Sequence, residues 1–337
     1  MKNMKKILSE AGRSKIKKAM PILSFPSVQL MGVSVERMIS QSALQARGMK
    51  MIADRVDSLA SVSMMDLSVE AESFGACVRF SENEVPTVVG QIVSCEADAD
   101  ALRVPDVLSG RTGIYIDAIS QAAELITDRP VIAGIIGPFS LAGRLMGVSE
   151  AMVYCFEEPG MVHKILEKAA AFLTEYAKKY KACGASGVMM AEPLAGLLSP
   201  DFNAEFSVPY ARRVADAVKG ENFAFIYHNC GNGVLSLIDG ILEIGADAYH
   251  FGNAIDIVEM LEKVPPEVVV MGNIDPAGQF CNGTRQSISA ATLDLLERTK
   301  KYKNHIISSG CDIPPASKWE NIDEFFSTVA EFYANRE

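Results

Sequence analysis

The sequence predicts an α/β fold, a (β/α)8 TIM barrel with an N-terminal helical extension over residues 1–20. From about residue 85 onwards, short apolar runs alternate with helical stretches. The short runs are apolar at nearly every position, which is typical of parallel strands covered by helices on both faces. The 337 residues also suit one barrel, which takes about 250 residues or more. We therefore expect a single domain over residues 1–337.

The expected elements follow in order along the chain. The basic start, Met1–Lys6, predicts a solvated first helix, and two apolar runs before residue 70 bring the strand count close to eight. Strands are expected over residues 22–29, 59–65, 131–138, 187–193, 223–227, 248–251, 268–273 and 305–309. Helices, with apolar residues spaced by three and four, are expected over residues 159–183, 202–218, 235–244, 256–263, 287–301 and 321–333. A doubly wound open sheet is the alternative, but no Gly-x-Gly-x-x-Gly motif follows the first strand to support it.

The composition excludes several classes of protein. A formal net charge of −10 argues against a nucleic-acid-binding protein, which needs a basic face. No run approaches the roughly 18 apolar residues that span a bilayer, and no apolar signal region follows the basic start. The seven cysteines are scattered and odd in number, which favours a reducing, cytoplasmic location. We expect five of them to be small core residues: Cys77, Cys95, Cys155, Cys183 and Cys281.

Three residues predict a zinc site at the ends of two strands. His228 and Cys230 are two positions apart at the end of a strand, so their side chains leave on the same side. Cys311 follows the strand expected over residues 305–309 and supplies a third ligand. Three protein ligands with a fourth position open are typical of catalytic zinc.

Other polar residues follow the predicted strands and are expected at the same rim of the barrel, where active sites form. These residues are Asp66, Glu192, His250 with Asn253, Asn273 with Asp275, and Asp312 beside Cys311. Asp275 has an equal alternative as a helix N-cap ahead of Pro276. His163 and His305 are expected to be structural or solvated.

The charge of the predicted site indicates its chemistry. Two thiolates and a neutral imidazole make a Zn²⁺ centre formally neutral, and a substrate thiol that binds there loses its proton. The bound sulfur keeps much of its nucleophilicity, which suits alkyl transfer to sulfur. A hydrolase would more often use ligands rich in histidine and carboxylate with an activated water.

Three segments resemble the uroporphyrinogen decarboxylase superfamily: Asp66–Ala76, Gly272–Pro276 and Gly310–Pro315. Within it, the chain is similar to the methylcobamide:coenzyme M methyltransferase branch, whose His-x-Cys…Cys zinc motif is matched by His228, Cys230 and Cys311. The resemblance runs from about residue 20 to 333. It implies a TIM barrel, bound zinc, and methyl transfer from a methylated corrinoid protein to a thiol such as coenzyme M.

The chain departs from the family pattern in three places. The Arg-Gln-Ala-Gly-Arg cluster with which decarboxylases bind porphyrinogen carboxylates is absent. Glu192 stands where the methyltransferases usually have an aspartate. His250 and Gly252 stand where a small polar residue and an acid are expected.

The leading hypothesis is a zinc-dependent methyltransferase that uses the methylcobamide of a partner corrinoid protein. Glu192 is expected as a transient fourth ligand, and Asp66, Asn273 and Asp275 are expected to shape the pocket or orient ligands. The acceptor is a small thiol or tetrahydrofolate. One alternative is a decarboxylase-like lyase with Asp66 as the acid. The other is a corrinoid-protein-binding subunit with weak or no catalysis. A homodimer stays open, and no residue is assigned to the cofactor itself.

Overall fold

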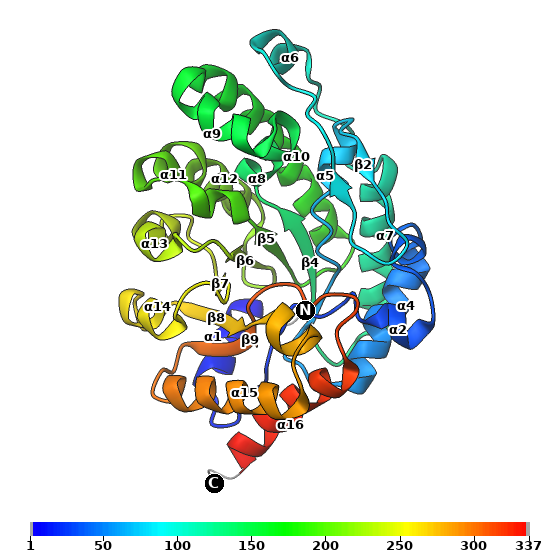
Figure 1. Ribbon diagram of the computed structural model, residues 1–337, viewed down its shortest axis with the longest axis vertical. Helices are drawn as coiled ribbons and strands as arrows, with labels where there is room; N and C mark the ends of the chain where they lie inside the picture. The colour runs from blue at the N-terminus through cyan, green and yellow to red at the C-terminus, as the bar shows by residue number, and fades with distance from the viewer. Residues whose placement is uncertain (1–2, 335–337) are drawn as a thin grey trace.

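The computed structural model describes residues 3–334 and contains a parallel sheet that curls inside a layer of helices (Figure 1). Seven strands form this sheet in the order β1-β4-β5-β6-β7-β8-β9, and all neighbouring pairs are parallel. Helices connect each strand to the next one in the sheet. The seven strands are β1 (Ser61–Val62), β4 (Val131–Ile136), β5 (Gly187–Ala191), β6 (Ala224–Asn229), β7 (Ala248–Phe251), β8 (Val269–Ile274) and β9 (His305–Ser309). This arrangement is TIM-barrel-like and confirms the predicted α/β class.

The helices lie before, between and after the strands. Those before β4 are α1 (Met4–Arg13), α2 (Ser27–Met31), α3 (Val35–Ile39), α4 (Ser42–Arg55), α5 (Val69–Ser73), α6 (Glu96–Ala101) and α7 (Gly110–Leu125). Those from β4 to β6 are α8 (Pro138–Met146), α9 (Val148–Glu157), α10 (Pro159–Ala182), η1 (Pro193–Leu197), α11 (Pro200–Phe206) and α12 (Val208–Val218). The last are α13 (Val234–Leu242), α14 (Ile257–Lys263), η2 (Pro276–Cys281), α15 (Arg285–Thr299) and α16 (Trp319–Ala334). A small hairpin, β2 (Val78–Arg79) with β3 (Thr87–Val88), was not predicted.

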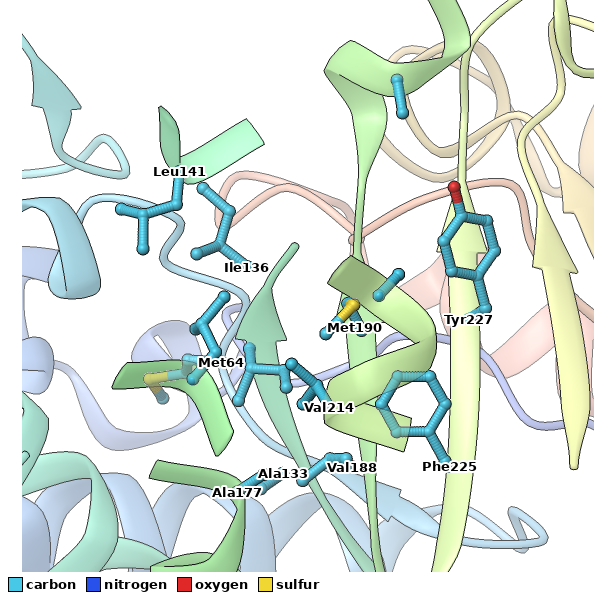
Figure 2. Packing of buried hydrophobic residues seen from close by; sticks show 14 of the residues in the cluster. Met64, Ala133, Ile136, Leu141, Ala177, Val188, Met190, Val214, Phe225 and Tyr227 are labelled. Carbon is cyan, nitrogen blue, oxygen red and sulfur yellow. The ribbon is translucent and has the colours of Figure 1, made fainter. Parts of the chain in front are cut away.

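Two apolar layers hold the sheet. The outer layer packs strands against helices, and Figure 2 shows Ala133, Val188 and Phe225 of three strands near Ala177 of α10 and Val214 of α12. The inner layer fills the inside of the curled sheet with side chains that alternate with the outer ones along each strand. Because both faces are covered, the strands are apolar throughout, which is the pattern from which the fold class was predicted.

The strand predicted over residues 22–29 is not formed. Pro26 has no N–H to donate and restricts Phe25, so this stretch turns into α2 instead of continuing a ladder. The residues just before it still join the two edge strands. The N–H of Met20 donates to the Ile307 carbonyl at 3.0 Å, and the N–H of Leu59 donates to the Ala19 carbonyl at 2.8 Å. An irregular segment therefore stands where an eighth strand was expected.

The first helix is not solvated as predicted. Met4 and Leu8 on one face of α1 are only 1% exposed and join the apolar side chains inside the sheet. The basic residues Lys5 and Lys6 lie on the other face and are exposed. The helix is therefore amphipathic, and it adds two large side chains to the inner core. Residues 1–2 of the predicted extension lie outside the described residues.

Smaller differences have local causes. The helix predicted over residues 202–218 is divided into α11 and α12, because Pro209 stands at the start of α12 and cannot continue a preceding helix. Cys77 and Cys95 are exposed, so the prediction that they fill the core is wrong, whereas Cys155 is buried. No helix within residues 3–334 is both long and apolar enough to cross a bilayer.

Candidate metal centre

The structure brings together the three residues that the sequence placed at strand ends. Ligand atoms of His228, Cys230 and Cys311 all lie within 4.8 Å of one another. His228 is the second-last residue of β6, and Cys230 directly follows that strand. Cys311 lies two residues after the end of β9. Two strands separate β6 from β9 in the sheet, so the curl of the sheet is what makes these ends meet. A group of one imidazole and two thiols could hold a metal ion such as zinc.

Two glycines allow the strand ends to approach. A Cβ on Gly252, which follows β7, would lie 2.6 Å from both Cα and Cβ of Cys230. A Cβ on Gly310 would lie 2.7 Å from the backbone nitrogen of Asn253. Real Cβ atoms do not make such contacts. Cys230 and Cys311 can therefore take these positions only because Gly252 and Gly310 have no side chain. An acidic side chain in place of Gly252, as the family resemblance implied, would collide with Cys230.

The contact between the two thiols moves their pKa values in opposite directions. The pKa of Cys230 is lowered, chiefly because the Cys311 thiol donates a hydrogen bond to its sulfur and also because His228 lies beside it. The pKa of Cys311 is raised well above its ordinary value by the same contact and by burial. Cys230 is thus the more acidic thiol of the pair. Metal ligation needs both sulfurs deprotonated, so binding would release the proton of Cys311.

Hydrogen bonds fix which nitrogen of His228 faces the thiols. Its Nδ1 lies 3.2 Å from the backbone carbonyl of His250, which can only accept, so Nδ1 carries the proton. The same N–H points at Nδ1 of the His250 ring at 2.8 Å. The unprotonated Nε2 therefore faces Cys311, whose Sγ lies 3.5 Å away. This tautomer is the one that can ligate a metal at the centre.

A second histidine and a serine complete this chain of contacts. Ser308 of β9 donates its hydroxyl proton to the Met20 carbonyl at 2.8 Å, so its Oγ accepts from Nε2–H of His250 at 2.7 Å. The Nδ1 of His250 is then a free acceptor for His228. Burial, with the nearby His228, lowers the pKa of His250 well below its ordinary value and keeps the ring neutral. His250 was predicted at the rim, but its partner Ser308 was missed, since only strand register brings the two together.

Glu192 does not join the group around the thiols. One carboxylate oxygen accepts from the N–H of Phe139 at 3.0 Å and the other from the N–H of Ser140 at 2.6 Å. These are free N–H groups in the first turn of α8, where a carboxylate is favourable. Burial raises the pKa of Glu192 to about 7. Since both oxygens are used, this geometry gives no support to the predicted fourth-ligand role, and it makes Glu192 the anchor of α8.

Asp66 lies in a separate buried network. It accepts hydrogen bonds from Arg111, from the Tyr115 hydroxyl at 3.1 Å and from the Ser68 hydroxyl at 2.6 Å. Arg111 also pairs with Glu72. Arg111 and Tyr115 come from α7, far along the chain, and no local signal in the sequence marked them as partners.

Asn273 and Asp275 organise the loops after β7 and β8. The Asn273 amide donates to the carbonyls of Gly252 and Ile255, each at 2.9 Å. It therefore holds the loop whose glycine packs on Cys230. Asp275 accepts from the N–H groups of Ala277 and Gly278, so it caps η2, as the alternative prediction had it. Asp312, beside Cys311, is half-buried, and the removal of its carboxyl group from water raises its pKa well above the ordinary value.

Comparisons with known proteins find relatives with two different activities. Two curated relatives are methylcobamide:CoM methyltransferases MtbA. That of Methanosarcina acetivorans is 27% identical over 274 residues, covering 79% of this chain and 78% of the relative. That of Methanosarcina mazei is 28% identical over 273 residues, covering 79% and 78%. The uroporphyrinogen decarboxylase of a Synechococcus species is 29% identical over 249 residues, covering 71% and 68%.

A solved structure supports the fold. The structure of a methyltransferase from Methanosarcina mazei superposes with a TM-score of 0.85 and covers 99% of this chain and 100% of its own, at 21% identity. The family model for uroporphyrinogen decarboxylase (URO-D) matches residues 17–332, which is nearly the whole chain. The matched span includes all seven strands of the sheet and the three clustered residues. Because the match covers nearly the whole chain, the chain belongs to the uroporphyrinogen decarboxylase family.

Proposed function

We propose that this protein is a zinc-dependent methyltransferase that moves a methyl group from the methylcobamide of a partner corrinoid protein to a small thiol. The observation that carries the proposal is the cluster of His228, Cys230 and Cys311 at the ends of β6 and β9. The methylcobamide:CoM methyltransferases among its relatives support the reaction class. The decarboxylase relatives do not decide between the two activities, because their identity to the chain is similar.

In this function, three residues would hold the metal and others would position them. His228, Cys230 and Cys311 would hold the zinc, which when bound supplies a cation that lowers the pKa of an acceptor thiol while leaving its sulfur nucleophilic. His250 orients the imidazole of His228 through Nδ1. Asn273 holds the Gly252 loop against Cys230. Glu192 and Asp275 fix the starts of α8 and η2. Asp66, held by Arg111, would shape the acceptor pocket.

Metal analysis of the purified protein, joined to a methyl-transfer assay, tests this function. We expect about one zinc per chain, reduced at least tenfold by Cys230→Ala. We also expect thiol-dependent loss of the methyl–cobalt absorbance when the protein is mixed with methylcobalamin. Zinc below about half an equivalent that does not change in Cys230→Ala would contradict the proposal.

The same assay separates the rival functions. A decarboxylase would turn over uroporphyrinogen without metal, with Asp66 as its acid, although Asp66 is bound here by Arg111, Tyr115 and Ser68. A subunit without catalysis would bind the corrinoid protein yet leave its methyl group in place with every thiol and with tetrahydrofolate.

The seven cysteines form no disulfide among the described residues, which fits the cytoplasmic location that we propose.

A further inference from the structure

Arg144 of α8 is a cation without a partner. No hydrogen bond or ion pair joins it to any side chain or backbone group within residues 3–334, although it is half-buried. Burial, with nothing to offset it, lowers its pKa. The contrast with Arg111 is direct, because Arg111 is also withdrawn from water but pairs with Asp66 and Glu72. Arg144 therefore combines partial burial with the lack of an acidic partner.

Arg144 lines a small cavity that has no acidic wall. The cavity has a volume of about 190 Å³, and its other lining side chains are apolar or carry a hydroxyl, with Met65, Leu67 and Val85 among the former and Ser68 and Thr87 among the latter. No carboxylate of the described residues lines it. A buried cation is costly unless an anion or hydrogen-bond acceptor meets it. The cavity suits a small organic anion and is too small for a tetrapyrrole.

Two sets of contacts connect the wall of this cavity to residues of the candidate metal centre. Met65 forms part of its wall, and the backbone of Met65 lies close to the carboxylate of Asp312, the residue that follows Cys311. Arg144 lies four residues after Ser140 and thus on the same face of α8. Ser140 binds the carboxylate of Glu192, whose own N–H donates to the His228 carbonyl at 2.9 Å. Both walls are therefore tied to residues that carry the ligands.

We propose that Arg144 binds the anionic group of the methyl-accepting thiol, a sulfonate or a carboxylate, and so selects charged thiols over neutral ones. This inference rests on the proposed function. The sulfur of the acceptor would bind at the centre formed by His228, Cys230 and Cys311, and Arg144 would bind the anionic group at the other end of the same molecule. A guanidinium presents paired N–H donors that match the oxygens of either anion, and such charge-assisted bonds are among the stronger ones. The apolar side chains of Met65 and Leu67 would pack on the short carbon link between the two ends.

The test compares acceptors that differ only in charge. Initial rates with methylcobalamin are measured for 2-mercaptoethanesulfonate, 3-mercaptopropionate and neutral 2-mercaptoethanol, in the zinc-loaded chain and in Arg144→Met and Arg144→Lys. We expect Arg144→Met to raise the KM of both anionic thiols about tenfold or more, which corresponds to ~1.4 kcal/mol, and to leave the KM of mercaptoethanol unchanged. Arg144→Lys keeps a charge without the paired donors and should fall between the two.

Arg103→Met is the matched control, because it removes the same charge from an exposed position after α6. It should leave all three KM values at those of the unchanged chain. The proposal is overturned if the unchanged chain has no preference for anionic thiols, or if Arg144→Met raises the KM of all three equally. A larger effect on the sulfonate than on the carboxylate, or the reverse, identifies which anion the cavity fits.

A binding measurement separates this inference from the proposed function. Ethanesulfonate and propionate have no thiol, so calorimetry with each reports on the cavity whether or not methyl transfer occurs. Binding to the unchanged chain but not to Arg144→Met, together with no methyl transfer to any thiol, would keep the anion site and reject the methyltransferase. Methyl transfer that proceeds with neither anion binding would reject the anion site and keep the methyltransferase.

Discussion

At the scale of single residues, the candidate centre depends on the orientation of one imidazole. The Nδ1–H of His228 has two acceptors, the His250 ring and the His250 carbonyl, and both leave Nε2 free to face Cys311. The ring of His250 is itself held by Ser308. Such partners of a metal-binding histidine commonly change metal affinity by about 10- to 100-fold when they are removed.

We expect His250→Ala to weaken zinc binding about tenfold, at the low end of that range, because the backbone carbonyl remains as an acceptor. Competition against a chromophoric chelator at fixed pH measures the dissociation constant directly and does not require activity. His163→Ala is the control, since His163 lies on α10 and contacts Tyr210 and Glu205 instead. Equal zinc affinity in His250→Ala and the unchanged chain would remove His250 from the centre.

The sequence predicted the three clustered residues but not what surrounds them. His228 and Cys230 share a strand, so a local rule for alternating side chains placed them together, and Cys311 followed from its position after another strand. The contact of His250 with Ser308 depends on the register of β7, β8 and β9 and on the curl of the sheet. The partners of the Glu192 carboxylate were not predicted, because a position at a strand end does not reveal that two N–H groups of α8 donate to it.

At the scale of elements, close packing between loops holds the ligands in place. Gly252 follows β7 and touches the backbone of Cys230, which follows β6. We expect Gly252→Ala to displace Cys230 and to weaken zinc binding at least tenfold, because the new Cβ would lie 2.6 Å from two Cys230 atoms. Zinc content and far-UV circular dichroism of the same sample distinguish a displaced ligand from an unfolded chain.

Gly160→Ala is the matched control for that change. Gly160 lies in the first turn of α10, and a Cβ there meets no atom within 4 Å. Alanine in a helix is more stable than glycine by roughly 0.5–1 kcal/mol, so this variant should unfold at the same or a slightly higher temperature and bind zinc normally. A Gly252→Ala chain that binds zinc as tightly as Gly160→Ala would show that Cys230 is not constrained by its neighbour.

The first helix is an element whose role the sequence did not predict. Its basic residues suggested a solvated helix, while Leu8 and Met4 in fact pack inside the curled sheet. Truncating a buried leucine to alanine typically costs 2–5 kcal/mol, so we expect Leu8→Ala to lower the free energy of unfolding by about that amount. Urea denaturation measures it, with Ile16→Ala as the control because Ile16 is 53% exposed. Equal urea midpoints for the two variants would mean that α1 does not contribute to the core.

At the scale of the whole molecule, the regular half of the fold was predictable and the irregular half was not. The strands over residues 248–251 and 305–309 have the predicted bounds. A short apolar run between two helices is stable as a parallel strand because both of its faces are buried. Residues 19–22 hydrogen-bond to both edges of the sheet without forming a strand, since Pro21 and Pro26 interrupt the pattern from which a strand is recognised. The small hairpin before β4 gave no periodic signal at all.

Buried acids also give the whole molecule a pH dependence of stability. Burial raises the pKa of Glu70 from 4.5 to about 7, where Oε1 accepts from the Ile136 N–H and Oε2 has no partner. Glu192 has a pKa of about 7 for the same reason. Both folded-state values lie above the ordinary value, so the folded chain binds these protons more tightly than the unfolded chain. Their contribution to stability is therefore complete below about pH 4.5 and is lost as the pH rises towards 7.

We expect Glu70→Gln to remove one of these two contributions. Each acid should lower the free energy of unfolding by about 1.4 kcal/mol per pH unit between pH 5 and 7, so the difference between the unchanged chain and Glu70→Gln should shift by roughly 2–3 kcal/mol over that interval, in favour of the variant at the higher pH. Urea denaturation at pH 5, 6 and 7 gives this difference free of the other titrating groups. Glu124→Gln alters an exposed glutamate of α7 and should show a constant difference. If the Glu70→Gln difference is also constant with pH, Glu70 is ionised in the folded chain throughout, and water must reach its unpartnered oxygen.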